Sequence, residues 1–332
     1  MKIRTSNKGE AIPSAKWITF YKYPLFSLLF FFGLFGWTTV SWPADWYVAK
    51  GKCSSSCDGT TWGKAWDEMN QIDWSTISVG DTIWLAGGTY STSLVPGKSG
   101  TPNKRINIRR IRATDPVCLS PCDATYDTQV VLSNGAYIGW TSGIDQLGSY
   151  VTVDGRMDSG IRATGGDSDW GAAVAINTRA TGLVIQNVEM VGPCDNIHIP
   201  KGDAHCLYMV TNFGRGSIPS DITIRYCRIH GAVNLVTMYA NNVTFEYNWM
   251  YENWPTNVGL YHSNVIYTDS STGSNIFRFN EVHRWINEGI LITGGVQIWK
   301  VYGNVWYNTI PVIARCMDVQ YGTHDVFFII TQ

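Results

Sequence analysis

The chain has 332 residues, of which 15% are charged, and its formal net charge is −1. This balance gives no electrostatic case for nucleic acid as a partner, because phosphate backbones are recognised by clustered Lys and Arg. The 15 Trp and 17 Tyr residues are many for this length, and they suit either a core of large rings or exposed platforms for sugar rings.

The N-terminal segment is basic and then apolar. Lys and Arg side chains precede an apolar run over residues 24–37, and small residues follow it. This order predicts a secretory signal cleaved near Ser41 or Ala44, and therefore a secreted or cell-surface protein. The run is short for a membrane span, so a membrane partner is expected only if the segment stays uncleaved as an anchor. We divide the chain into residues 1–44, signal or anchor, and residues 45–332, one folded domain.

The start of the folded domain predicts a strand, a helix and a second strand. Residues 46–60 suit a strand followed by a Gly/Ser-rich turn. Trp62, Trp66 and Met69 recur at helical spacing, which predicts a short helix that covers the N-terminal end of the domain. Residues 80–90 then alternate as a strand.

A motif of alternating apolar and polar residues returns five times between residues 183 and 306. The copies, aligned on their third residue, give spacings of 39, 21, 32 and 24 and bring together Ile185, Ile224, Phe245, Phe277 and Val301. Short strands that repeat in this way cannot bury their apolar face alone, so they predict a solenoid, specifically an all-β parallel β-helix. The turn residues of the later copies are interpreted as a buried ladder, Cys227, Asn248, Asn280 and Asn304.

Four stretches carry a resemblance to a known family: "TTWGKAWDEMNQI", "GDTIWLAGGTY", "PGKSGTPNKRINIR" and "SYVTVDGRMDSGIR". They are similar to secreted right-handed parallel β-helix proteins of the pectate-lyase-like superfamily, and the resemblance extends over about residues 46–330. It implies a single-stranded right-handed β-helix with a short N-terminal capping helix. Many members are polysaccharide lyases or glycoside hydrolases, and some use Ca²⁺. This sequence lacks the polygalacturonase motifs and the Asp-rich strands that bind Ca²⁺ in pectate lyases, so no site residue is carried over.

A second set of short apolar strands lies between the copies, and polar residues stand at the start of each. These strands precede the motif by similar distances, so we expect them to form one parallel sheet with a spacing of about 4.8 Å between coils. The polar residues should then form a column on one face: Asp203, His205, Asn234, His262, Asn264, Asn287, Glu288 and Arg315.

This column is the candidate site. β-Elimination on a uronic-acid polymer needs a base and a group that neutralises the carboxylate. We expect His262 or His205 as the base with Glu288 assisting, and the substrate-binding residues are Asp203, Lys201, Asn234, Asn264, Asn287 and Arg315. A role as turn residues is the equal alternative for His205 and His262. His230 and His283 are interpreted as turn residues.

The function that fits this column is a polysaccharide lyase acting on an extracellular polysaccharide. A glycoside hydrolase is less favoured, because Asp203 and Glu288 stand several coils apart and hydrolysis needs a close carboxylate pair. A non-catalytic glycan-binding or adhesive solenoid is the alternative from another class. We expect a monomer.

Eight cysteines fit an oxidising compartment. Their spacing predicts three local disulfides and a buried free thiol at Cys227, with Cys316 unassigned; the pairs are Cys53–Cys57, Cys118–Cys122 and Cys194–Cys206. The acidic loop between the last pair suits Ca²⁺ as a cofactor, but a polar loop pinned by its disulfide is preferred and no metal ligands are assigned. The chain ends directly after an apolar strand, residues 326–330, without a polar cap, so we expect the natural protein to be longer.

Overall fold

The structure is a computed structural model that describes residues 42–53, 55–118, 124–140, 147–166, 171–177, 179–194, 205–209, 218–254, 263–269, 272–309, 314–320 and 323–329. The chain divides into Met1–Trp42 and Pro43–Gln332, and every described strand lies in the second unit. Residues 1–41 of the predicted signal or anchor lie outside the described residues, and residues 42–44 lie within them. Among the described residues, no helix has the length and apolarity that a membrane crossing requires.

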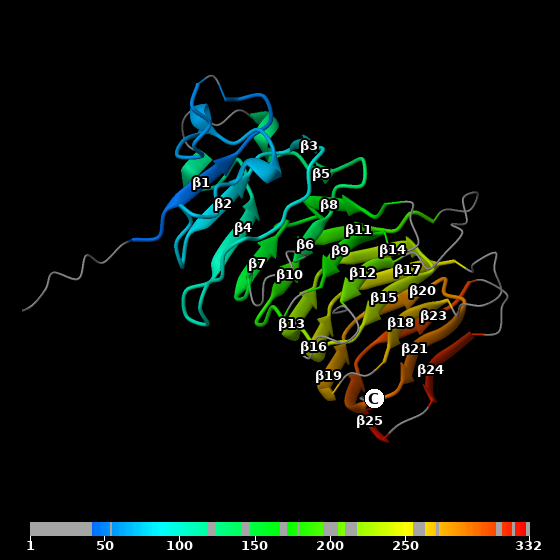
Figure 1. Cartoon of the computed structure of the whole chain (residues 1–332). Coiled ribbons are helices and arrows are strands. Elements are labelled where there is room, and N and C mark those ends of the chain that lie inside the picture. The colour runs from blue at the N-terminus through cyan, green and yellow to red at the C-terminus, as the bar shows by residue number, and fades with distance from the viewer. Residues whose placement is uncertain are drawn as a thin grey trace, which may run out of the picture. The chain divides into compact units, whose positions relative to one another are not determined.

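The second unit is a coil of short strands that form three parallel sheets (Figure 1). Sheet A has ten strands, β1 (Asp45–Val48), β2 (Thr82–Leu85), β4 (Ile106–Arg110), β7 (Val151–Asp154), β10 (Val184–Gln186), β13 (Ser220–Arg225), β16 (Asn241–Glu246), β19 (Thr272–Arg278), β22 (Val296–Tyr302) and β25 (Thr323–Ile329). Sheet B has eight strands, β3 (Gly88–Tyr90), β5 (Val130–Leu132), β8 (Ile161–Thr164), β11 (Val188–Val191), β14 (Arg228–Ala232), β17 (Trp249–Asn253), β20 (Glu281–His283) and β23 (Val305–Tyr307).

Sheet C has seven strands, β6 (Ile138–Trp140), β9 (Ala172–Ile176), β12 (His205–Met209), β15 (Asn234–Met238), β18 (Asn264–Thr268), β21 (Asn287–Thr293) and β24 (Ala314–Gln320). From β7 onward the chain visits sheets A, B and C in turn, and each strand pairs in parallel with the strand one coil away. This is the predicted all-β parallel β-helix. Its topology agrees with the predicted right-handed coil, because connections between parallel strands of one sheet are right-handed almost without exception.

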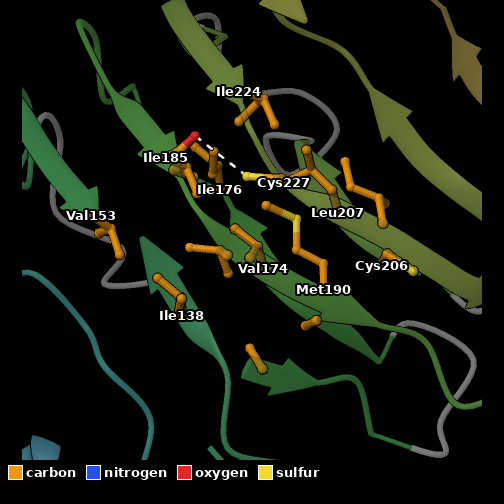
Figure 2. Packing of buried hydrophobic residues seen from close by; sticks show 14 of the residues in the cluster. Ile138, Val153, Val174, Ile176, Ile185, Met190, Cys206, Leu207, Ile224 and Cys227 are labelled. Carbon is orange, nitrogen blue, oxygen red and sulfur yellow. Dashed lines mark hydrogen bonds between the residues drawn. The ribbon is translucent and has the colours of Figure 1, made fainter. Parts of the chain in front are cut away.

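The predicted inward row is confirmed residue by residue. Ile185 pairs with Ile224, Ile224 with Phe245, Phe245 with Phe277, and Phe277 with Val301 on adjacent strands of sheet A. Figure 2 shows how Ile185 and Ile224 meet residues of the other sheets, among them Met190 and Leu207, inside the coil. Stacking keeps each apolar side chain between two others, which a single strand could not achieve.

The turns between sheets A and B hold the predicted buried ladder. The Oδ1 atom of Asn248 accepts the backbone N–H of Cys227 at 3.0 Å, and Asn304 Oδ1 accepts the backbone N–H of Asn280 at 2.8 Å. The Cys227 thiol is 1% exposed and points toward the carbonyl oxygen of Ile185, 3.6 Å away (Figure 2). The ladder satisfies backbone groups that the turns would otherwise bury unpaired.

The predicted N-terminal capping helix is wrong, because the described residues there form two short 3₁₀ turns, η1 (Trp62–Lys64) and η2 (Met69–Gln71). Trp66 lies between them and is extended, since its backbone bonds to Tyr47 and Ala49 beside β1. The apolar residues at helical spacing are nevertheless all buried. Two further 3₁₀ turns are η3 (Pro116–Cys118) and η4 (Ala124–Asp127).

The disulfide predictions have three outcomes. Cys53 and Cys57 are joined, as predicted. Cys118 is disulfide-bonded, and its predicted partner Cys122 lies outside the described residues. The predicted Cys194–Cys206 disulfide is not present: both residues are buried thiols, and that of Cys206 donates to the carbonyl oxygen of His230 at 2.9 Å.

Candidate functional site

The polar column predicted from the sequence forms one row across sheet C. His205 pairs with Asn234, and Glu288 pairs with Asn264 on one side and with Arg315 on the other. The row is continuous between Asn234 and Asn264, because Oδ1 of Asn234 accepts both the backbone N–H (3.1 Å) and the side-chain amide (2.9 Å) of Asn264. Five adjacent strands, β12, β15, β18, β21 and β24, thus carry the row.

Exposure changes along this row. His205, Asn234 and Asn264 are buried, Asn287 and Glu288 are half-buried, and Arg315 is exposed. The two buried amides hydrogen-bond each other, which is the arrangement of a structural ladder. The part of the row that solvent reaches is therefore its Glu288 and Arg315 end.

His205 is enclosed by its neighbours on sheet C. Its Nδ1 atom lies 3.0 Å from Oγ1 of Thr237, and its ring lies 4.9 Å from the ring of Tyr208. Burial lowers the pKa of His205 to about 3, so the imidazole is neutral at ordinary pH. A neutral imidazole has the right form for a base, but this side chain is 0% exposed and has no surface for a substrate. Its contacts are those of a residue that holds Thr237 in place.

The backbone on either side of Glu288 has special geometry, and Arg315 is held by a neighbouring carboxylate. Asn287, just before Glu288, has a left-handed φ of 61°, and Gly289 follows. A Cβ atom on Gly289 would lie 2.4 Å from the carbonyl oxygen of Cys316, so only glycine allows β21 and β24 to approach here. Arg315 Nη1 donates to Oδ2 of Asp318 at 3.2 Å. The Glu288 carboxylate and the Arg315 guanidinium thus belong to neighbouring strands, and neighbouring strands of a sheet are about 4.8 Å apart.

Tyrosines beside the row were missed by sequence reasoning. Tyr208, Thr237 and Tyr267 pair across adjacent strands, and the ring of Tyr239 lies 6.5 Å from that of Tyr267. Burial raises the pKa of Tyr239, and Tyr267 and Asp269 raise it further. The sequence signal was a tyrosine three residues after the polar residue of the row in two strands, Tyr208 after His205 and Tyr267 after Asn264. Three further predicted site residues, Lys201, Asp203 and His262, lie outside the described residues.

His230 and His283 are strand residues, which corrects their interpretation as turn residues. They lie on β14 and β20 of sheet B, in one row with Tyr251 and Tyr307. Successive rings in this row stack at 4.5, 5.0 and 5.1 Å with interplanar angles below 10°. Nε2 of His230 also lies 3.2 Å from Oε1 of Glu189, and this contact is the main cause of the lowered pKa of the Glu189 carboxyl. These rings stabilise the outer face of sheet B.

Comparison with known proteins identifies the fold. No protein-family model and no curated protein matches the chain. The structure of XylC in complex with xylose superposes with a TM-score of 0.52 and 10% identity, over 86% of this chain and 65% of that one. A rhamnogalacturonan lyase superposes with a TM-score of 0.49 and 11% identity, over 78% of this chain and 74% of that one. The pectate lyase Pel9A superposes with a TM-score of 0.45 and 12% identity, over 86% of this chain and 79% of that one.

This chain thus spans slightly less than two thirds of the length of XylC. Identities near 10% concern the fold, and that fold agrees with the three parallel sheets and the in-register apolar row described above. The chain has a parallel β-helix fold, which it shares with XylC.

Proposed function

We propose that this chain is a secreted carbohydrate-active β-helix protein that cleaves a uronic-acid-containing polysaccharide by β-elimination. The observation that carries the proposal is the row on sheet C, in which Glu288 is paired in register with Asn264 and Arg315. The fold it shares with XylC, whose structure was solved with xylose, is consistent with a sugar ligand.

The reaction needs a base, a group that neutralises the uronate carboxylate and a group that orients the substrate. A base removes the proton beside the uronate carboxylate, a carbon–carbon double bond forms, and the bond to the leaving sugar oxygen breaks. Arg315 neutralises the carboxylate and so stabilises the developing negative charge. Because His205 is enclosed, the base in this proposal is His262, two residues before Asn264 in the sequence. Glu288 assists by orienting the substrate.

The test is the ultraviolet absorbance of the unsaturated product, measured with the purified protein on a panel of acidic polysaccharides, with and without Ca²⁺. We expect new absorbance on one substrate class. His262→Ala should lower the rate by about 10²–10⁴-fold, the usual contribution of a positioned base. His283→Ala, a histidine on sheet B, is the matched control and should keep the full rate. No absorbance from the folded protein, or a fully active His262→Ala, would overturn the proposal.

A hydrolase is less compatible with the register. His205, near Asp203 in sequence, is three strands from Glu288 in sheet C, which is about 14 Å at 4.8 Å per strand. Hydrolytic carboxylate pairs lie about 5–9.5 Å apart.

Non-catalytic glycan binding is the second candidate, and exposed rings favour it. Trp249 is 39% and Tyr307 is 43% exposed on sheet B. A binder would be depleted from solution by a polysaccharide without producing absorbance or reducing ends, so the same panel separates the two functions.

A further inference from the structure

A groove lies at the corner where strands of sheet A turn into sheet B. Its volume is about 820 Å³, and the residues that matter on its walls are Arg112, Asp154, Arg156, Asn187, Arg225 and Tyr226. They come from successive coils: Asp154, Gln186 and Arg225 are paired in register on β7, β10 and β13. The groove belongs to the corner between sheets A and B, whereas the Glu288 row belongs to sheet C.

The loop that carries Arg156 differs from the turns of later coils. Those turns use one left-handed residue, such as Tyr226 or Tyr247, whereas residues 155–160 form a longer loop. Arg156, Asp158 and Ser159 all have left-handed φ angles, of 71°, 57° and 52°. Non-glycine residues in this region are strained, and they persist where the surroundings fix them.

Asp154 fixes this loop. Its Oδ1 atom accepts the backbone N–H of Arg156 and the side-chain amide of Asn187, both at 2.8 Å. Asp154 is the one acidic residue of the groove lining, and its carboxylate is hydrogen-bonded to the loop and to Asn187. The other charged residues of the lining are arginines.

Each of the three arginines has a partner that holds it, but these partners do not occupy all of its N–H donors. Nη2 of Arg156 lies 2.8 Å from Asp115, Nε of Arg225 donates to Gln186 at 2.7 Å, and Nε of Arg112 lies 3.9 Å from Asp127. Arg225 also approaches Glu246 at 3.8 Å. A guanidinium has five N–H donors in a fixed fork, so these contacts orient the groups while other donors remain for an anion. Three of the lining residues are arginines and one is an aspartate, and the acidic partners Asp115, Asp127 and Glu246 are not part of the lining.

Tyr226 adds a flat apolar wall. The ring is 50% exposed, and Tyr247 stacks on one of its faces at 5.2 Å with an interplanar angle of 10°. One coil earlier, the same turn position is Asn187, whose amide is bonded to Asp154. The stack of rings thus ends at Tyr226 where the groove begins. The Arg225 guanidinium carbon lies 6.0 Å from the centre of this ring.

We propose that this groove binds one anionic pyranose unit, with the sugar ring against Tyr226 and its carboxylate or sulfate group on Arg156 and Arg225. An aromatic face matches the apolar face of a sugar, and a guanidinium fork matches both anions. The inference concerns binding alone and does not depend on the proposed lyase activity. In a chain that cleaves an acidic polymer, this site would hold the polymer at a distance from sheet C.

The test uses three monosaccharide probes that contain no bond for a lyase to cleave: methyl galacturonoside, methyl galactoside and methyl galactoside 6-sulfate. Binding to the full chain is measured by titration calorimetry and by saturation-transfer NMR. We expect at least one anionic probe to bind and the neutral one to bind at least tenfold more weakly, with affinity falling as salt rises. The stronger of the two anionic probes identifies the anion.

Variants locate the site. Arg156→Ala and Tyr226→Ala should each lower the affinity for the anionic probe at least tenfold. Arg156→Lys should recover part of that loss of affinity. Phe279→Ala, which alters a ring of the same stack outside the groove, and Arg228→Ala, an arginine on sheet B, are the matched controls and should bind normally. Urea unfolding confirms that each variant is folded.

Two results would overturn the inference: equal affinity for the neutral and anionic probes, or unchanged affinity in folded Arg156→Ala and Tyr226→Ala. Because no probe is a lyase substrate, neither result bears on the ultraviolet assay.

Discussion

The Oδ1 atom of Asn280 accepts two hydrogen bonds from Asn248, one from the backbone N–H and one from the side-chain amide, each at 3.0 Å. Asn280 in turn donates its own amide to Asn304 at 3.0 Å and to the carbonyl oxygen of Phe245 at 3.1 Å. One side chain that is 1% exposed therefore serves three neighbouring coils.

Asn280→Ala should lower the free energy of unfolding by about 3 kcal/mol, because it leaves buried donors and acceptors of the adjacent coils unpaired at about 1–3 kcal/mol each. Urea unfolding followed by tryptophan fluorescence measures the loss. Asn177→Ala, at an exposed position, is the control. A loss no larger than that of the control would show that the ladder does not stabilise the turns.

Phe277→Ala should cost about 3–5 kcal/mol of unfolding free energy, because it opens a cavity between Phe245 and Val301 that the stacked coils cannot close. Phe277→Leu, which keeps most of the volume, should cost about 1.5 kcal/mol or less. The comparison is made by urea unfolding of both variants. Equal costs would mean that the row relaxes around the missing ring.

Thiol labelling should separate the cysteines of the native chain. Burial raises the pKa of the Cys227 thiol to about 12 and that of Cys206 well above its usual value, so neither should react with iodoacetamide before unfolding. Cys316 is exposed and should react first. Mass spectrometry of labelled peptides gives the result. Protection of Cys194 and Cys206 that persists in denaturant would instead reveal the disulfide that the sequence spacing predicts.

Acid should destabilise the chain through His205. The folded-state pKa of about 3 lies below the unfolded value of 6.5, so the unfolded chain takes up the proton first. The stability that the neutral ring contributes is present above pH 6.5 and decreases, by up to about 1.4 kcal/mol per pH unit, as the pH falls toward 3.

Urea unfolding of the wild type and of His205→Gln, at about pH 7 and about pH 5, tests this linkage. The variant should lose less stability than the wild type between the two pH values, whatever its stability at neutral pH. Equal losses would show that His205 is not the group responsible.

Much of the fold could be predicted because its rules are local and repeat. Period-two alternation determines which residues face inward, and the recurring Asn determines the register, so the alignment of Ile185, Ile224 and Phe245 follows from the sequence alone. The helix predicted from Trp62, Trp66 and Met69 was wrong for a physical reason. Two 3₁₀ turns with an extended residue between them can bury apolar residues at the same spacing.

The site was harder to predict for a physical reason. Register brought His205 and Glu288 into one row, but whether a side chain is enclosed depends on its surroundings in space, which alternation does not encode. The groove was missed because Arg112, Arg156 and Arg225 come from different coils, and a motif read along one coil does not show which side chains of other coils lie beside it. The parallel stacking of β7, β10 and β13 brings successive coils together at this corner.

The register between Cys227 and Asn248 closes a full circuit of the coil in 21 residues. A circuit that begins and ends at equivalent positions can be copied in tandem within a gene, because the new copy presents to its neighbours the same edges that the old one did. The length of this protein is therefore open to change by whole turns of the coil, and each added turn would lengthen its surface without requiring a new fold.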